Sequence, residues 1–261
     1  MGLTHSQWMV AMGTTPHYTQ DDRAAQPWEP DGRPVSPATT APPTDLPTLL
    51  AAVRRRWGTH ALRPLSQVTP PRRLTTGRPT LDAALRGGWP TGRLIVLHSQ
   101  LTSGATTLAL AGLRAAQTPG QVVVVLDSLQ RFDPAAAVAG GLILDDLCLL
   151  RPDSSAEAFA MAAWLAQAGG VGGVVWLGAA AGAAGWGRLA GLLAHTPAVW
   201  LALTYAPLPP GSPLAHSAAV QATVTRQAWL RRRGDVTGAR AQLSGADGQT
   251  WGAATLDWAA V

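Results

Sequence analysis

Residues 93–107 read RLIVLHSQLTSGATT, and this stretch decides the fold that we expect. Residues 93–98 form a short apolar run typical of a buried strand, 99–104 form a polar loop, and 105–117 have the composition of a helix. Strands that alternate with helices build a parallel sheet. The stretch therefore predicts an α/β protein.

The loop has the layout of a phosphate-binding loop, whose pattern is G-x-x-x-x-G-K-[ST]. In that pattern backbone N–H groups hold the phosphates, the lysine reaches the outer phosphates and a hydroxyl binds Mg²⁺. When the chain is aligned on Gly104, a serine replaces the first glycine and an alanine replaces the lysine. The residues of this degenerate loop are Ser99, Ser103, Gly104, Ala105, Thr106 and Thr107.

No shifted alignment supplies the lysine, because all 20 basic residues of the chain are arginines. The N–H groups at the start of the helix still form a weak anion site. Without the ammonium group, the main electrostatic clamp on a triphosphate is missing. The alternative is an ordinary corner between a strand and a helix.

The composition suits one sizeable α/β domain, since 47% of the 261 residues are hydrophobic and 13% are charged. The formal charge of +5 is compatible with nucleic acid or an acidic protein as a partner, and requires neither. The single cysteine, Cys148, is expected in a buried strand, and we expect a cytoplasmic protein. No signal peptide or membrane span is expected, and neither a metal nor a cofactor.

Four segments are expected along the chain. Residues 1–44 are rich in proline and threonine and read as a disordered tail. Residues 45–73 form a helix and linker, with Asp45 as the N-cap and Arg54, Arg55 and Arg56 at the end where cations complement the helix dipole. A contact of these arginines with phosphate or protein is the alternative. Residues 74–246 form the core and 247–261 a C-terminal tail, in which TLDWAAV is either a partner motif or a docked strand.

Apolar runs predict further strands at 122–126, 147–150, 172–178 and 198–204, with helices at 79–85, 135–139, 155–168 and 186–195. The glycine-rich stretch 87–90 is expected to be a turn. In the helix at 155–168 we expect one face toward the core, made of Ala156, Phe159, Ala160, Ala163 and Trp164. Residues 218–246 alternate like an antiparallel meander at the sheet edge.

The order of these motifs resembles the core of RecA-type recombinases. Residues 74–97, LTTGRPTLDAALRGGWPTGRLIVL, look like the segment that leads into the family's phosphate loop. Residues 122–134, VVVVLDSLQRFDP, look like its next strand: Asp127, Asp133 and Pro134 match, and Leu129 stands at the catalytic glutamate. Residues 172–178 look like the Walker B strand, with Leu177 at its closing aspartate. The resemblance implies a RecA fold without ATP hydrolysis, since leucine and alanine cannot replace these charges.

Within this superfamily, residues 45–245 are similar to the ImuA group of accessory proteins. The likeness rests on ALRGGWPTG (84–92), LRPDSSAEAFAMAAWLAQAGGVGGVVWL (150–177) and WLRRRGD (229–235). It implies an adaptor in SOS-induced translesion synthesis, with an ImuB-like protein and an error-prone polymerase as partners and RecA or DNA as further candidates. A SulA-like inhibitor of cell division and a DNA-binding RecA paralogue are the alternatives.

The segments that match the DNA-binding loops of RecA-type proteins are 178–188 and 205–218. The first contains one arginine and the second none, whereas tracking of phosphates needs several cations. A RecA-style filament on DNA is therefore not expected. Trp186, Arg188 and Tyr205 remain the candidate DNA contacts in these two segments.

Arg231, Arg232 and Arg233 form the strongest local charge. They are either a nucleic-acid or partner patch or solvated arginines that discourage pairing at a sheet edge.

Overall fold

The computed structural model describes residues 45–58, 70–206, 208–209 and 211–257. The predicted tail at 1–44 and most of the predicted linker therefore lie outside the described residues. The chain divides into two compact units, Met1–Val68 and Thr69–Val261. Each unit is described by itself.

The first unit contains one described helix, α1 (Leu46–Trp57). Asp45 caps it as predicted, because its Oδ2 accepts hydrogen bonds from the Thr48 N–H at 3.0 Å and from Thr48 Oγ1 at 2.8 Å. The Thr48 N–H also holds the pKa of Asp45 below its usual value. The helix ends at Gly58, whose φ of +89° suits glycine and whose N–H bonds to the Arg54 carbonyl.

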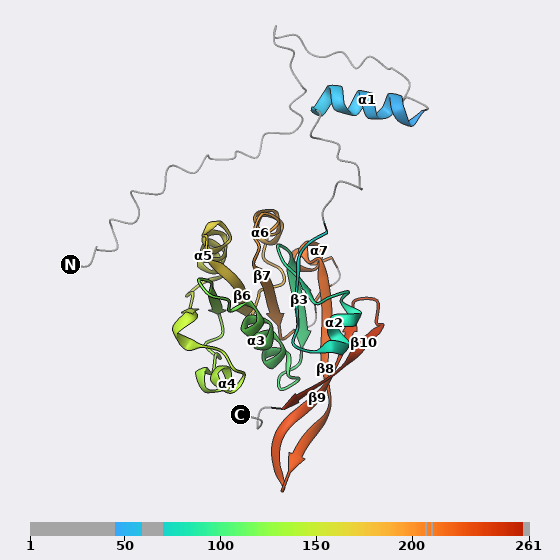
Figure 1. Cartoon of the computed structure of the whole chain (residues 1–261). Helices are drawn as coiled ribbons and strands as arrows, with labels where there is room; N and C mark the ends of the chain where they lie inside the picture. Colours follow the sequence, from blue (N-terminus) through green and yellow to red (C-terminus); the bar gives the residue numbers. More distant parts are fainter. Residues whose placement is uncertain (1–44, 59–69, 207, 210, 258–261) are drawn as a thin grey trace, which may run out of the picture. The chain divides into compact units, whose positions relative to one another are not determined.

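The second unit is built on an eight-stranded sheet with the order β10-β9-β8-β3-β7-β6-β4-β5 (Figure 1). Its six strands from β8 to β5 run parallel, and β9 and β10 continue the sheet in antiparallel fashion. The predicted fold class, a mostly parallel sheet with an antiparallel C-terminal edge, is confirmed. The strands are β3 (Leu94–Ser99), β4 (Val122–Asp127), β5 (Leu147–Leu150), β6 (Val171–Leu177), β7 (Val199–Thr204), β8 (Val220–Arg232), β9 (Asp235–Gly245) and β10 (Thr250–Asp257).

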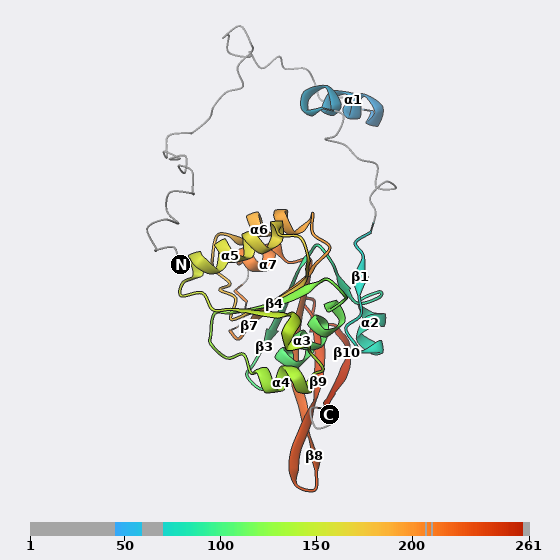
Figure 2. The same cartoon turned by 60° about the vertical axis from the view of Figure 1, so that its left-hand side comes forward.

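Helices cover both faces of the sheet, and the sheet separates the hydrophobic core into two layers. One layer packs α2 (Pro79–Ala84), α3 (Ala105–Ala116) and α4 (Pro134–Ala139) against the sheet. The other packs α5 (Ser155–Gln167), α6 (Trp186–Leu193) and α7 (Pro213–Ser217) against the opposite face. Figures 1 and 2 show α5, α6 and α7 grouped away from α3 and α4. Both layers are apolar because the parallel strands bury side chains on each face.

The stretch at 87–90 differs from its prediction as a turn. Trp89 and Pro90 form β2 (Trp89–Pro90), which pairs with β1 (Arg73–Leu74) in a separate two-stranded ribbon. Gly88 has a φ of +106°, and a Cβ there would lie 2.1 Å from the Leu74 carbonyl oxygen. Glycine is required because the two backbones approach so closely.

Asp82 joins α2 to the turn before it. It accepts hydrogen bonds from Thr75 Oγ1 at 2.5 Å and from the Thr76 N–H at 2.7 Å. Burial works to raise the pKa of Asp82, but these hydrogen bonds outweigh burial and lower the pKa from its ordinary value of 3.8. The ionised carboxylate therefore stabilises the folded chain.

We expect Asp82→Asn to lower the free energy of unfolding at pH 7 by about 1 kcal/mol, because the amide is a weaker acceptor and Asp82 is partly exposed. Since the folded-state pKa is depressed, the contribution is present above pH 3.8 and is lost as the pH falls through the folded-state pKa. Urea unfolding of both proteins from pH 7 to pH 3 measures this. Parallel pH profiles for the two proteins would contradict the assignment.

The predicted core face of α5 is correct for Phe159, which packs against the core, and wrong for Ala156, Ala160 and Trp164, which are exposed. Trp164 is 68% exposed, and the buried side chains are those of Ala158, Ala162, Leu165 and Ala166. The helix has apolar side chains around most of its circumference, so the sequence pattern gave no clear direction. Phe159 is directed inward. The centroid of its ring lies 5.0 Å from the ring centroid of Trp176 and 4.8 Å from the ring centroid of Trp186.

Two further expectations change with the position of the sheet edges. Cys148 lies in a strand as predicted, but it is exposed, because β5 is an edge strand. The predicted C-terminal tail supplies β10, the outermost strand at the other edge, and residues 258–261 lie outside the described part. No helix among the described residues is long and apolar enough to cross a membrane.

Candidate functional site

The loop between β3 and α3 lies at the carboxyl end of a central strand, where ligands bind in open α/β sheets. The predicted strand, loop and helix are confirmed. Gly104 precedes α3 with a φ of +93°, and a Cβ there would lie 2.2 Å from Leu256 Cδ1 of β10. The positive φ therefore favours glycine, and a larger residue would also displace the Leu256 side chain.

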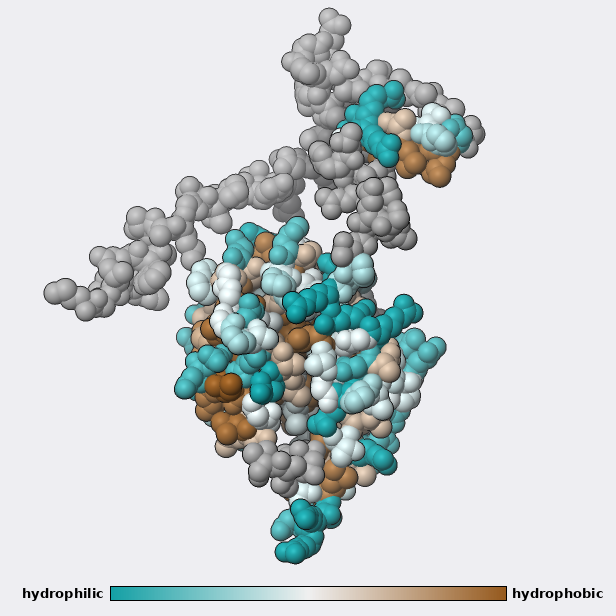
Figure 3. Space-filling view, in the orientation of Figure 1, coloured by the Kyte–Doolittle hydropathy of each residue, from teal (hydrophilic) through white to brown (hydrophobic). Residues whose placement is uncertain are grey.

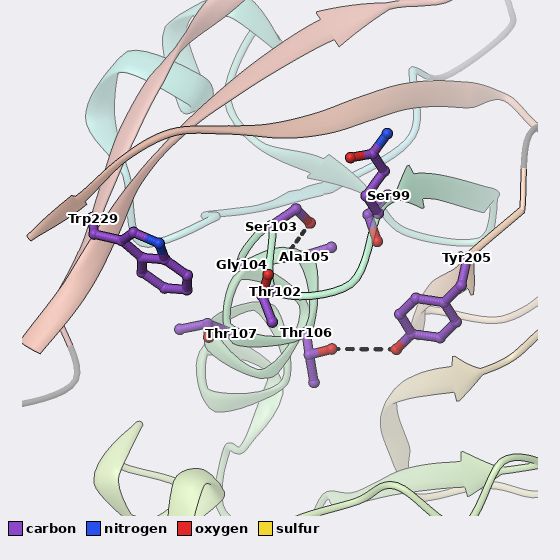
Figure 4. Close-up of a pocket in the computed structure, with 10 residues that line it drawn as sticks. Ser99, Thr102, Ser103, Gly104, Ala105, Thr106, Thr107, Tyr205 and Trp229 are labelled. Carbon is purple, nitrogen blue, oxygen red and sulfur yellow. Dashed lines mark hydrogen bonds between the residues drawn. The ribbon is translucent and has the colours of Figure 1, made fainter. Parts of the chain in front are cut away.

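A cavity of about 240 Å³ opens over the N-terminus of α3. Figure 4 shows Trp229 from β8 and Tyr205, which follows β7, on opposite sides of the loop. All six residues of the predicted degenerate loop line the cavity. Its walls are formed by Ser99, Gln100, Thr102, Ser103, Gly104, Ala105, Thr106, Thr107, Tyr205 and Trp229.

The lining offers hydroxyl and N–H groups and contains neither a basic side chain nor a carboxylate. Thr106 Oγ1 lies 3.3 Å from the Tyr205 hydroxyl, and the Ala105 N–H donates to Ser103 Oγ at 3.4 Å. The hydroxyl of Ser99 is buried and has no hydrogen-bond partner among the described residues. The site can therefore donate hydrogen bonds to a small acceptor, but it holds no full positive charge.

The residue before Ser99 adds no charge to the site at neutral pH. His98 Nδ1 lies 3.2 Å from Thr204 Oγ1 of β7. Burial lowers the pKa of His98, and this effect exceeds the opposing hydrogen bonds to the backbone of Ala206 and Thr204. The imidazole is thus neutral at pH 7.

The three degenerate catalytic positions hold apolar side chains, of which Ala105 and Leu177 are buried and Leu129 is 41% exposed. Ala105 is 2% exposed and Leu177 is 1% exposed within the layer of α3. Leu129 covers Gly178, where an added Cβ would lie 2.3 Å from Leu129 Cγ. The structure does not bring Leu129 or Leu177 to the wall of the cavity.

Asp127, which matches the RecA pattern, shapes the turn after β4. It is fully buried and accepts hydrogen bonds from the Arg131 N–H at 3.0 Å and the Phe132 N–H at 2.9 Å. Arg151 Nε lies 3.8 Å from Asp127 Oδ2. Asp133 also fits the pattern, and it caps α4 through the Ala135 N–H. Asp127 and Asp133 thus both have structural roles in the described residues.

The candidate DNA contacts in 178–188 and 205–218 differ in exposure and in the partners of their side chains. Trp186 is completely buried, with its Nε1 donating to the Ala180 carbonyl at 2.8 Å, so its side chain is not presented to DNA. Arg188 is exposed on α6. Tyr205 is directed toward Thr106 at the loop.

The arginine groups fall on both units. Arg54, Arg55 and Arg56 are exposed in the last turn of α1. Arg231, Arg232 and Arg233 are exposed where β8 turns into β9. Figure 3 shows hydrophilic side chains at the tip of this hairpin. Pairing of β8 with β3 ends at Ser99 and Val224, so the hairpin extends beyond the parallel part of the sheet.

Sequence reasoning missed the two residues of β8 that reach the loop. Arg226 Nη1 donates to the Thr102 carbonyl at 2.9 Å and also to Thr102 Oγ1. Its guanidinium lies 4.0 Å from the centre of the Trp229 ring. The sequence carries no local signal for these contacts, because Arg226 and Thr102 are 124 residues apart and meet only through the β3–β8 pairing.

Comparison with known proteins agrees with this fold. A model of the RecA N-terminal domain matches residues 45–186, which is more than half of the chain. The chain belongs to the RecA N-terminal domain family. This assignment confirms the coarser part of the resemblance, a RecA-like fold.

Curated RecA proteins are similar to part of this RecA-like chain. The chain is 37% identical to RecA of Synechocystis sp. over 111 residues, which are 42% of the chain and 31% of that protein. RecA of Gloeobacter violaceus is 38% identical over 111 residues, 42% of the chain and 30% of that protein. RecA of Streptococcus pyogenes serotype M49 is 38% identical over 99 residues, 38% of the chain and 26% of that protein. The matched stretch thus spans less than a third of the length of these relatives.

Proposed function

We propose that this RecA-like chain does not hydrolyse ATP and acts as an adaptor in bacterial DNA damage tolerance. The observation that carries the proposal is that Ala105, Leu129 and Leu177 stand where a RecA-type ATPase needs a lysine, a glutamate and an aspartate, with Ala105 and Leu177 buried in the core. Each of those charges has a separate task in phosphoryl transfer. The loss of all three removes the clamp, the base and the metal ligand together.

The remaining residues of the loop do not fit a magnesium nucleotide. The cavity of about 240 Å³ is smaller than most pockets for drug-sized ligands, and its walls supply only neutral groups. Thr106 retains the hydroxyl of the pattern, but this hydroxyl faces Tyr205. Arg226 is near the loop, and its guanidinium is engaged by Thr102 and Trp229.

The role in translesion synthesis rests on the resemblance to the ImuA group. Exposed apolar side chains on the second unit support protein partners, since such side chains gather at interaction surfaces. Trp164 is exposed on α5, and Val138, Ile143 and Leu144 are exposed at α4 and the short helix η4 (Leu144–Asp146). Figure 3 shows a hydrophobic patch where Figure 1 places α4. The proposed partners are an ImuB-like protein, an error-prone polymerase and RecA.

Deletion of the gene in its source organism tests this role. The rise in mutation frequency after DNA damage should disappear and should return when the intact gene is supplied. A copy that carries Ala105→Ser should restore it equally well, because the proposed role needs no lysine or nucleotide at this position. Unchanged damage-induced mutation in the deletion strain would contradict the proposal, and filamentation on overexpression in that case would favour an inhibitor of cell division.

Direct binding of DNA is a second candidate function, and the β8–β9 hairpin favours it. The hairpin places Arg231, Arg232 and Arg233 close to Trp229, which is 38% exposed. Arginine side chains pair with phosphates, and an exposed aromatic ring can stack on a base. The flank of the hairpin therefore has both kinds of group that single-stranded DNA requires.

We expect replacement of Arg231, Arg232 and Arg233 by glutamine to weaken binding of single-stranded oligothymidine. Removal of these phosphate contacts should reduce the slope of log affinity against log salt by about 2 to 3. Fluorescence anisotropy at several salt concentrations measures the slope. Arg93→Gln is the matched control, since Arg93 is exposed at the opposite end of β3. An equal slope for the wild type and the triple variant would exclude the hairpin as a DNA contact.

A further inference from the structure

The loop over the cavity is held in a strained backbone conformation. Thr102 has a φ of +63°, in the left-handed region that β-branched residues rarely adopt. Such a conformation persists only where surrounding contacts enforce it. In the described residues these contacts are a hydrogen bond from Thr102 Oγ1 to the Leu101 carbonyl at 2.6 Å and those from Arg226, which donates to both the carbonyl and the hydroxyl of Thr102.

The same arginine connects the loop to the wall of the cavity and to the basic hairpin. The guanidinium of Arg226 lies 4.0 Å from the centre of the Trp229 ring, a distance that suits a cation–π contact. Trp229 lines the cavity, and the three exposed arginines follow it along β8. The β8–β9 pairing is irregular between Arg226 and Ala228 and again between Leu230 and Arg231, which are points where a strand can bend.

We infer that Arg226 is a latch that couples the basic hairpin to the loop before α3. With the latch closed, Arg226 holds Thr102 in its strained conformation and keeps Trp229 beside the cavity. A polyanion that binds along β8 competes for the guanidinium, because a phosphate oxygen accepts a stronger hydrogen bond from arginine than a neutral carbonyl or hydroxyl does. Thr102 then relaxes, Trp229 loses its contact with the guanidinium, and the loop opens at the N-terminus of α3.

The coupling must act in both directions, since two linked equilibria shift each other equally. Opening of the loop frees Arg226 for the polyanion, and binding of the polyanion opens the loop. The response to nucleic acid rests on the DNA contact proposed above, whereas the latch itself does not depend on DNA. The Arg226 latch and its response to DNA therefore need separate measurements.

The accessibility of the loop can be measured with a single thiol. Cys148 is the only cysteine of the chain and Ser103 is buried in the loop, so the full chain with C148S and S103C carries one reporter thiol. Its rate of reaction with a thiol reagent reports local opening. Adding R226Q should raise the rate by about tenfold or more without DNA, because the strained loop loses its restraint. R93Q serves as the control and should leave the rate unchanged.

Addition of single-stranded oligothymidine completes the test. The oligonucleotide should raise the reaction rate of the C148S and S103C protein that retains Arg226. It should have little further effect on the same protein with R226Q. Equal rates with and without R226Q in the absence of DNA would overturn the latch. A bound oligonucleotide that leaves the rate unchanged would overturn the coupling. If the oligonucleotide does not bind, the DNA contact of the hairpin fails and the coupling with it, while the rates without DNA still decide the latch.

Discussion

Replacement of Leu177 by aspartate should lower the free energy of unfolding by roughly 3 kcal/mol or more, although it restores the residue that the Walker B strand of an ATPase carries. Leu177 ends β6 between β4 and β7 and is 1% exposed in the layer of α3. A carboxyl group there loses its hydration and gains no cation. We therefore expect the substitution to disrupt the core without creating a metal ligand.

Urea unfolding followed by circular dichroism measures this effect. Leu177→Met is the control, because a swap that conserves volume in a core costs under about 1.5 kcal/mol. A stable aspartate variant would show that this end of β6 is open to water. Burial of Leu177 would then not explain why the chain lacks a metal ligand at this position.

Replacement of Asp127 by alanine should cost about 3 kcal/mol, because it leaves the partly buried N–H of Arg131 and the buried N–H of Phe132 without an acceptor. Asp133, the exposed aspartate in residues 122–134, gives a matched control. Asp133 caps α4 through one hydrogen bond to Ala135, so Asp133→Ala should cost only about 1 kcal/mol.

The difference between these two aspartates tests whether the motif is structural in this chain. Urea unfolding of the two alanine variants compares them under one set of conditions. Equal costs would contradict the role of Asp127 in the turn after β4. A loss of function without a loss of stability in Asp127→Ala would indicate a chemical role instead.

The strands and most helix boundaries could be predicted because their signals are local. A β-branched run between Gly120 and a polar turn gave β4, and Asp45 marked the start of α1. The degenerate loop could also be predicted, since its six residues are consecutive or nearly so. For such features the sequence pattern and the packing favour the same structure.

Features that depend on the assembled sheet could not be predicted in the same way. Cys148 is exposed only because β5 lies at an edge, and the sequence does not state the strand order. Trp164 faces outward on a helix whose apolar residues surround its axis. Arg226 and Trp229 reach the loop through the pairing of β8 with β3, which joins distant segments. Part of the candidate site therefore became visible only with the fold.

We expect that the chain binds no magnesium nucleotide, and calorimetric titration of the full chain with a non-hydrolysable ATP analogue and Mg²⁺ measures this. No measurable heat of binding is expected at millimolar analogue, because the loop lacks the lysine and leucines stand at the positions of both carboxylates. Tight, magnesium-dependent binding would contradict it. The backbone and arginines such as Arg226 would then have to replace the missing lysine, and the chain would be a nucleotide-gated switch.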